Sequence, residues 1–378
     1  MPEFPKSEYE ERLKRLRSML EARGMDLLLV SCEENNRYFA GAKSLVTWRS
    51  FTRPVFVIAD GKKPPIIVIH ESLADAAKSE GYCCDIRTYA SITEPPVRQL
   101  SKILKETLPS GGRVGFEGGY EQRIGLPFSD MTALVSSAPH IHFVDASSII
   151  WNLRMKKSAR EVDCMKNAGR ILAKARPHAV SRMRSGMTER EAARIVGATI
   201  LEFGADEVAF VHVNTGRPHT WYPTDRKLSP GDLVYIDAGA TVKGYTCEYD
   251  RLATVGRPTK VQRALHESVC HVVDGMRSFM KANTKCSEVY AECDRLYSQQ
   301  GRRTAKWGRA GHGQGLLATE PPSIAFHDTT VLLPGMTVSN EPGFICGEGV
   351  FVWEDVYAIT SEGNTTLSIE PRELMQIS

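Results

Sequence analysis

The sequence predicts two consecutive domains, an α/β domain over residues 1–152 and an α+β domain over residues 153–378. In the first part of the chain, short apolar runs bounded by turn residues alternate with helical stretches, which is typical of an α/β domain with a largely buried sheet. In the second part, long helical stretches interleave with strand hairpins, which favours helices packed outside a curved antiparallel sheet. A chain of 378 residues is long enough for each domain to bury its own core.

Apolar spacing and turn residues predict the elements of the first domain. Residues 8–23 are expected to form a helix, because Leu13, Leu16 and Leu20 recur at helical spacing and Gly24 then stops the pattern. A second helix is expected over residues 97–107. Four apolar runs are expected to form the strands of the sheet: residues 26–31, 54–59, 65–70 and 113–117.

Long helices and hairpins are expected in the second domain. Thr188 and Glu191 form a capping-box pattern at the start of one helix, and Lys243-Gly244 is expected to turn a hairpin. The predicted helices cover residues 159–175, 188–203, 261–282 and 287–299. The predicted strands cover residues 208–213, 233–238, 245–254, 337–341 and 350–359.

Composition and charge exclude several kinds of partner. The net charge is +3 and no block of lysine and arginine is present, so neither nucleic acid nor an anionic membrane surface is an expected partner. The apolar runs are only as long as strands, so no segment is expected to span a membrane. The nine cysteines form no C-x-x-C pair and the first residues lack an apolar signal core, so we expect a cytoplasmic protein.

Five residues of the second domain have the chemistry of a metal site. They are Asp237, Glu248, His312, Glu341 and Glu354. Four carboxylates that share a cleft without a counter-charge would repel one another and take up protons. Together with one imidazole they suit one or two hard or borderline divalent cations. The second domain is therefore predicted to be a metallohydrolase.

The local sequence supports these candidates individually. Asp237 follows four apolar residues of a predicted strand, where aspartate is disfavoured. Glu354 lies inside the apolar segment VFVWEDV, where a carboxylate is costly unless it is paired or bound to a metal. A hairpin would place Glu248 beside Asp237 across paired strands, although Asp250 competes for the same role. Glycines on both sides of His312 allow the backbone to approach a ligand closely.

The ordered motifs resemble a known family. The segments PTDRKLSPGDLVYIDAG, GYTCEYDR, GHGQGLLATEPPSI, LLPGMTVSNEPG and VWEDVYAIT are similar to those of the pita-bread fold, which methionine aminopeptidase, aminopeptidase P, prolidase and creatinase share. The amino half resembles the smaller creatinase/prolidase-type amino-terminal domain. The resemblance covers nearly the whole chain and implies a pita-bread catalytic domain behind that smaller domain.

The resemblance also implies roles for the candidate residues. In metal-dependent members, two Asp, one His and two Glu bind a dinuclear site; these positions fall here on Asp237, Glu248, His312, Glu341 and Glu354. Bound Mn, Zn or Co would activate water, and Glu341 would take up its proton. His219, in a turn-rich loop, would assist the leaving group or the substrate. The resemblance therefore implies His219, Glu341 and Glu354 as catalytic residues.

Three departures from the family pattern argue against a standard proline peptidase. Glu248 stands where the second metal-binding Asp is usual. The family's His-Glu-x-Pro is replaced by a segment that begins at Thr319, so the substrate-facing histidine is missing and Thr319 is the expected substrate contact there. The arginine commonly found two positions before the last Glu is Val352.

A loop of the first domain suggests a carboxylated substrate. Trp48, Arg49 and Arg53 lie close together after an apparent strand, and arginine suits bidentate capture of a carboxylate. In relatives this loop reaches the active site of the neighbouring subunit, which implies a homodimer.

The first hypothesis is therefore a metal-dependent hydrolase that cleaves an amide or peptide C–N bond in a small carboxylated substrate, similar to an Xaa-Pro dipeptidase or aminopeptidase. The second is a metal-free enzyme on a small C–N compound, as in creatinase or ectoine hydrolase, or a pita-bread lyase. A non-catalytic binding module is the third, but such members usually lose most of the metal ligands, and four of five are kept here.

Overall fold

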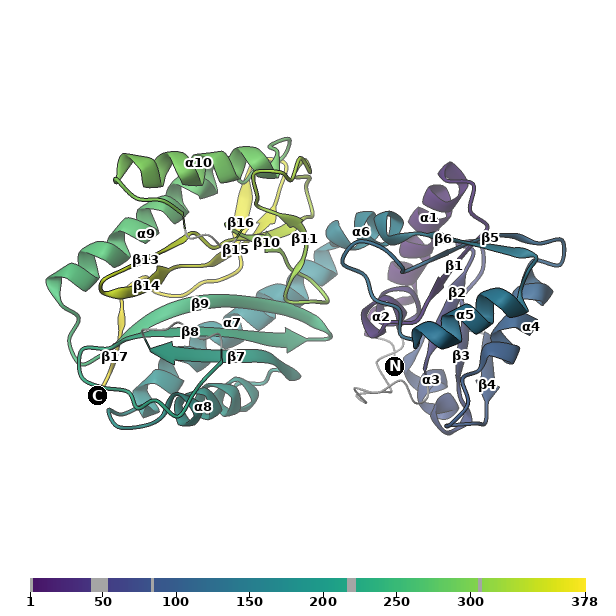
Figure 1. Ribbon diagram of the computed structural model, residues 1–378, viewed down its shortest axis with the longest axis horizontal. Coiled ribbons are helices and arrows are strands. Elements are labelled where there is room, and N and C mark those ends of the chain that lie inside the picture. Colours follow the sequence, from purple (N-terminus) through teal and green to yellow (C-terminus); the bar gives the residue numbers. More distant parts are fainter. Residues whose placement is uncertain (1–2, 42–53, 83–84, 216–221, 305–307) are drawn as a thin grey trace. The chain divides into compact units, whose positions relative to one another are not determined.

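The computed structural model describes residues 3–41, 54–82, 85–215, 222–304 and 308–378. The chain divides into two compact units, Met1–Arg154 and Met155–Ser378 (Figure 1). The first unit is an α/β unit around one mixed sheet, and the second is an α+β unit with mainly antiparallel sheets. Each has its own buried apolar cluster. The predicted succession of an α/β and an α+β domain is confirmed.

The amino-terminal unit is built on a six-stranded sheet in the order β4-β3-β2-β1-β5-β6. Strand β2 pairs antiparallel with β1 and β3, and the other pairs are parallel. The strands are β1 (Leu27–Val30), β2 (Phe56–Ala59), β3 (Ile66–His70), β4 (Asp85–Tyr89), β5 (Gly112–Phe116) and β6 (Ile141–Asp145). The helices are α1 (Lys6–Ala22), α2 (Glu33–Ala40), η1 (Glu71–Leu73), α3 (Ala74–Glu80), α4 (Val97–Thr107), α5 (Phe128–Ser137) and α6 (Ser147–Met155).

The two edge strands of this sheet were not predicted. Strands β1, β2, β3 and β5, which lie inside the sheet, coincide with predicted apolar runs. Strands β4 and β6 lie at the edges and have a single buried residue each, Tyr89 and Ile141. An edge strand buries less side-chain surface than an inner strand, so its sequence contains no continuous apolar run.

The carboxyl-terminal unit contains two sheets and a hairpin. One sheet has the order β17-β9-β8-β7 and the other the order β11-β10-β12-β15-β16. The first comprises β7 (Glu207–Thr215), β8 (Leu233–Val242), β9 (Tyr245–Val255) and β17 (Met375–Ile377). The second comprises β10 (His312–Gly313), β11 (Glu320–Ser323), β12 (Thr337–Asn340), β15 (Asp355–Ile359) and β16 (Asn364–Thr366). The hairpin is β13 (Gly343–Cys346) with β14 (Gly349–Val352).

Helices cover the outer faces of these sheets. The unit contains α7 (Ala159–Arg182), α8 (Glu189–Glu202), α9 (Lys260–Phe279) and α10 (Cys286–Gln299). In Figure 1, α7 and α8 lie against β7–β9, while α9 and α10 lie on the side of the second sheet and the hairpin. The capping box predicted at Thr188 and Glu191 is present at the start of α8. Because β8 and β9 are buried along nearly their whole length, carboxylates on them are shielded from water.

The strand predicted over residues 350–359 is wrong in one respect. The chain forms two strands there, β14 and β15, with Trp353 and Glu354 between them. Strand β14 pairs with β13, whereas β15 pairs with β12, so the chain changes sheets at this point. The buried guanidinium of Arg251 stabilises this break between the strands. It donates one hydrogen bond to the carbonyl oxygen of Glu354 and another, of 2.9 Å, to Asp355 Oδ1.

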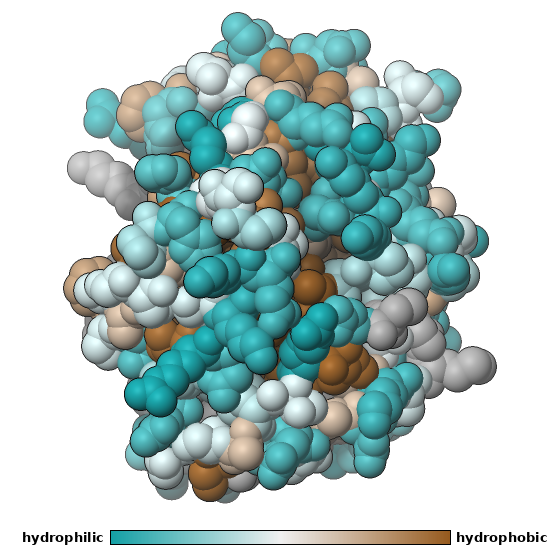
Figure 2. Space-filling model, turned by 90° about the vertical axis from the view of Figure 1, so that its right-hand side faces the viewer, coloured by the Kyte–Doolittle hydropathy of each residue, from teal (hydrophilic) through white to brown (hydrophobic). Residues whose placement is uncertain are grey.

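The surface is mainly polar on the face drawn in Figure 2, where apolar side chains appear in small separate groups among the described residues. None of the helices in the described ranges has both the length and the apolar character that crossing a membrane requires.

Candidate metal centre

The five predicted ligands come from separate strands that the fold brings together. Asp237 lies on β8, Glu248 on β9 and His312 on β10. Glu341 follows β12 directly, and Glu354 lies in the break between β14 and β15. The centre therefore forms where the two sheets of the carboxyl-terminal unit meet.

The strand register corrects one detail of the prediction. Asp237 pairs directly with Asp250, and Glu248 lies opposite Gly239, two positions further along the same face. A Cβ atom at position 239 would lie 3.1 Å from Glu248 Cβ and 2.9 Å from Ala209 Cβ. The glycine therefore leaves room for the Cβ atom of Glu248 on this face of the sheet.

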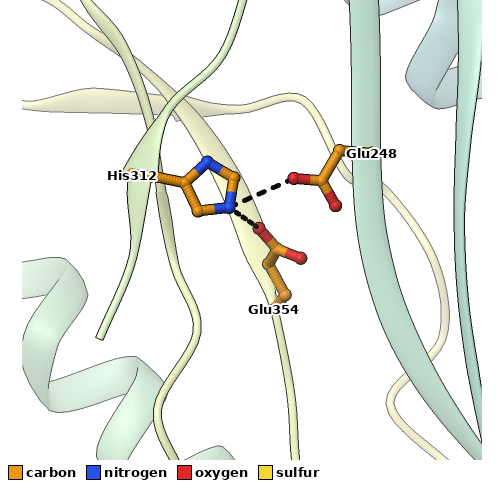
Figure 3. A group of neighbouring side chains, drawn as sticks. All are labelled: Glu248, His312 and Glu354. Atoms are coloured by element: carbon orange, nitrogen blue, oxygen red, sulfur yellow. Dashed lines mark ion pairs between the residues drawn. The ribbon is translucent and has the colours of Figure 1, made fainter. Parts of the chain in front are cut away.

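His312 lies at the focus of three carboxylates. Its Nε2 atom is 3.2 Å from Glu248 Oε1 and 3.6 Å from Glu354 Oε1 (Figure 3). The same atom is 4.0 Å from Glu341 Oε2. Its Nδ1 atom lies 3.1 Å from the carbonyl oxygen of Gly313, an interaction that only a protonated Nδ1 satisfies. Burial, and then the charge of Arg309, lower the imidazole pKa to about 3. The ring is neutral and its Nε2 lone pair faces the carboxylates.

The possible ligand atoms form two overlapping triplets. Glu248, His312 and Glu354 form one, and Asp250, Glu341 and Glu354 form the other; within each, the atoms lie within 4.8 Å of one another. Glu354 belongs to both triplets. The two triplets thus provide two adjoining positions with one shared carboxylate.

Burial makes this cluster electrostatically unfavourable by itself. It is the largest cause that raises the pKa of Glu248, Asp250 and Glu354 well above ordinary carboxyl values, and neighbouring carboxylates add to it. The pKa of Glu341 rises to about 8 for the same two reasons. Bound cations would remove this repulsion without protonating the carboxyls.

Unsatisfied oxygens show that the residues present fit divalent cations. Asp237 Oδ1 and Asp250 Oδ2 are buried and have no hydrogen-bond partner among the described residues. By contrast, both carboxylate oxygens of the buried Glu117 and of the buried Glu189 accept hydrogen bonds. A donor set of carboxylate oxygens with one imidazole nitrogen is also the chemistry that Mn²⁺, Zn²⁺ or Co²⁺ binds.

Several polar residues that the sequence analysis missed orient the ligands. Gln314 donates from Nε2 to Glu248 Oε1 at 2.9 Å and to Glu354 Oε1 at 3.3 Å. The Tyr235 hydroxyl donates to Asp237 Oδ2 at 3.1 Å, and His212 Nδ1 lies 3.6 Å from the same oxygen. Such neighbours fix the rotamers of metal ligands. Alternation along the strands was the available signal, because Tyr235 and Gln314 each lie two residues from a predicted ligand.

The centre opens into a cavity of about 530 Å³. Lining residues include Phe210, His212, Arg309 and Thr319, together with the predicted ligands Asp237, Glu248, His312 and Glu341. This volume is typical of a site for a small molecule. Thr319, predicted to contact substrate, is thus on the cavity wall. The other predicted contacts, His219, Trp48, Arg49 and Arg53, lie outside the described residues.

Comparison with known proteins agrees with this architecture. The family model "Metallopeptidase family M24" matches residues 163–361, and "Creatinase/Prolidase N-terminal domain" matches residues 12–156. The Xaa-Pro dipeptidase of Pyrococcus furiosus is 26% identical over 373 residues, which cover 97% of this chain and 100% of that protein. The probable dipeptidase PepE of Mycobacterium tuberculosis is 28% identical over 65% of this chain and 70% of its own.

A solved structure extends the likeness to three dimensions. The Xaa-Pro dipeptidase from Bacillus anthracis superposes with a TM-score of 0.84 at 26% identity, over 98% of this chain and 100% of that one. The fold and the centre thus define a metallopeptidase-like hydrolase. The chain belongs to metallopeptidase family M24, with a creatinase/prolidase amino-terminal domain, and is a hydrolase of peptide C–N bonds. The family resemblance predicted from the motifs is confirmed.

Proposed function

We propose that this chain is a metal-dependent dipeptidase that cleaves the peptide bond of a small carboxylated substrate and has no strict requirement for proline. The observation that carries the proposal is the pair of overlapping triplets that share Glu354, together with the unsatisfied buried oxygens of Asp237 and Asp250. Relatives of similar length are Xaa-Pro dipeptidases, which supports the dipeptide substrate.

The proposed ligands are the five predicted residues, with Asp250 as an additional carboxylate of the second triplet. Ions held there would supply activation of water and polarisation of the scissile carbonyl group. Mn²⁺ suits the carboxylate-rich donor set best. Gln314 and Tyr235 keep the carboxylates in place, so that the charge of the centre is organised before substrate arrives.

Glu341 is the proposed acid–base residue. It lines the cavity and its Oε2 atom lies 4.0 Å from His312 Nε2, at the border between the centre and the substrate space. Burial raises its pKa to about 8 in the absence of cations, and bound cations would favour the carboxylate form that accepts a proton. In the proposed reaction its carboxylate accepts the proton of the attacking water and returns it to the leaving amine. His219 would assist the leaving group.

The relaxed requirement for proline rests on two positions. Thr319 occupies the place of the family's substrate-facing histidine, and Val352 occupies the place of an arginine. Val352 is 1% exposed and packs in the core, so no cation faces the substrate from that position. A homodimer in the cytoplasm, with Trp48, Arg49 and Arg53 near the partner's site, remains part of the proposal on the family resemblance alone.

Elemental analysis after loading with Mn²⁺ tests the proposal. The wild type should retain one to two ions per chain and cleave dipeptides such as Ala-Leu as well as Ala-Pro. The Glu354→Gln variant should lose more than half of the bound metal and at least 100-fold in kcat, because the shared carboxylate serves both triplets. The exposed Glu362→Gln variant is the matched control. A chain that binds no ion under any loading but acts on small guanidino or cyclic amidine compounds would establish the creatinase-like alternative.

A further inference from the structure

Arg309 provides a positive charge in the wall of the substrate cavity. It lies three residues before His312 and is half-buried. Among the described residues that line the cavity, it is the only lysine or arginine. Its positive charge interacts electrostatically with the centre and lowers the pKa values of both His312 and Glu341. The guanidinium therefore lies close to the place where a substrate binds.

The donors of Arg309 are largely unused. Its one hydrogen bond within the described structure runs from Nη2 to Thr319 Oγ1, at 3.4 Å. It forms no ion pair with a described carboxylate, although several carboxylates lie next to it in the centre. The structural arginines of the same unit differ, since Arg251 and Arg176 are buried and pair with Asp355 at 2.9 Å and Glu370 at 2.7 Å.

A half-buried guanidinium with free donors beside a cavity is suited to a carboxylate ligand. Arginine binds carboxylates with two parallel N–H···O bonds, and these bonds are strong where water is partly excluded. Val352, two residues before Glu354, is buried and apolar and cannot serve. Arg309 approaches the cavity from the segment that precedes β10, and lines the same cavity as Thr319.

We propose that Arg309, oriented by the Thr319 hydroxyl, binds the terminal carboxylate of the substrate and so limits this enzyme to dipeptides with a free carboxyl end. The inference rests on the proposed peptidase function and adds the residue that selects substrates by their length. A longer peptide would place an uncharged peptide group against the guanidinium, and would lose that charge pairing.

The competing explanation is that Arg309 only offsets the negative charge of the metal ligands. In that case its removal would affect metal binding and would change the turnover of all substrates alike. Carboxylate capture instead affects only ligands that carry the carboxylate, and appears in KM rather than in kcat.

The experiment compares Ala-Leu with its carboxyl-terminal amide, using Mn²⁺-loaded wild type, Arg309→Ala, Arg309→Lys and Arg303→Ala. Arg303 is an exposed arginine of the same segment that does not line the cavity, so its variant is the matched control. Arg309→Ala should raise KM for Ala-Leu roughly 10- to 100-fold, as expected for loss of a charged hydrogen bond, with little change in kcat. KM of Arg309→Lys for Ala-Leu should lie between the values of the wild type and of Arg309→Ala. KM for the amide should be the same in all variants.

A binding measurement keeps the test independent of catalysis. Calorimetry with a reduced dipeptide, in which CH₂–NH replaces the peptide bond, should show wild type binding the free acid at least tenfold more tightly than the amide. Arg309→Ala should abolish this preference and Arg303→Ala should keep it. Equal weakening of acid and amide, or a loss of Mn²⁺ affinity alone, would overturn the inference. A wild type that prefers the acid but hydrolyses neither compound would refute the peptidase function and leave the carboxylate site standing.

Discussion

At the scale of single residues, the centre is defined by carboxylates that have too few partners. Glu354 belongs to both triplets, and Asp237 and Asp250 each keep one buried oxygen without a hydrogen bond in the described structure. The buried Glu189 uses both of its oxygens and is structural. Burial alone therefore does not distinguish a ligand from a structural carboxylate, and neither does a single unsatisfied oxygen, because Glu370 keeps one although it pairs with Arg176. The distinguishing feature is that several such carboxylates cluster together without an arginine or lysine ion pair among the described residues.

The stability of the metal-free protein should depend on pH because of these residues. Burial raises the pKa of Glu248, Asp250 and Glu354 above the unfolded values, and that of Glu341 to about 8. A raised pKa means that the folded state holds protons which the unfolded state releases. This contribution to the free energy of unfolding is complete below the unfolded pKa of about 4.3 and is lost as pH rises through the folded pKa values.

We therefore expect the melting temperature of the metal-free protein to fall from about pH 5 to about pH 8, and Mn²⁺ to raise it more at the higher pH. Thermal unfolding followed by circular dichroism, with and without chelator, measures both effects. Glu341→Gln removes one of the titrating groups and should flatten the pH dependence. A melting temperature that rises with pH in the absence of metal would contradict the expectation.

At the scale of elements, Glu189 ties two parts of the catalytic unit together. It lies at the start of α8 and accepts hydrogen bonds from the backbone and hydroxyl of Thr215, at 2.7 and 2.8 Å, and from those of Thr224, at 2.9 and 2.7 Å. Burial would raise its pKa, but these hydrogen bonds lower it below the usual value. Thr215 is the last residue of β7, so this carboxylate ties the start of α8 to the end of that strand.

Glu189→Gln should destabilise the protein by about 2–4 kcal/mol. The NH₂ group of glutamine would face N–H and O–H donors of the threonines, which the carboxylate accepts in the wild type. Urea unfolding, monitored by tryptophan fluorescence, gives the change in free energy. Glu191→Gln, in the same helical turn, is a suitable control, since glutamine preserves the capping box. Equal effects of the two substitutions would show that the buried hydrogen bonds of Glu189 contribute no more to stability than those of the exposed Glu191.

At the scale of the whole molecule, only one of the two units holds the centre. Each unit has its own apolar core, and every residue of the two triplets belongs to Met155–Ser378. A cation stabilises the part of a protein to which it binds, by about 2.7 kcal/mol at a concentration 100 times the Kd.

Calorimetric unfolding is expected to show two transitions, of which Mn²⁺ moves only that of the carboxyl-terminal unit, upward by about 5–10 °C. Glu354→Gln should abolish this shift and leave the other transition unchanged. If one single transition moves as a whole, the two units unfold cooperatively and the expectation is wrong.

The sequence by itself was sufficient for the inner strands, the long helices and the family. These elements are encoded locally, by apolar runs and by the Thr188–Glu191 capping box. The five ligand candidates could also be named, because acidic residues inside apolar strands are costly enough to indicate a function. Their roles as ligands stay a prediction, although the structure brings all five together.

Only the tertiary structure decided how these residues meet. Strand register made Asp250, and not Glu248, the direct partner of Asp237, and gave Glu248 its space opposite Gly239. The change of sheets at Glu354 likewise depends on strand pairing, with β13 on one side and β12 on the other. The approach of Arg309 to Thr319 accompanies the antiparallel pairing of β10 with β11. A local sequence pattern indicates which face of a strand is buried. Packing between distant segments determines which charged groups are buried next to one another, and this proximity determines the chemistry of the site.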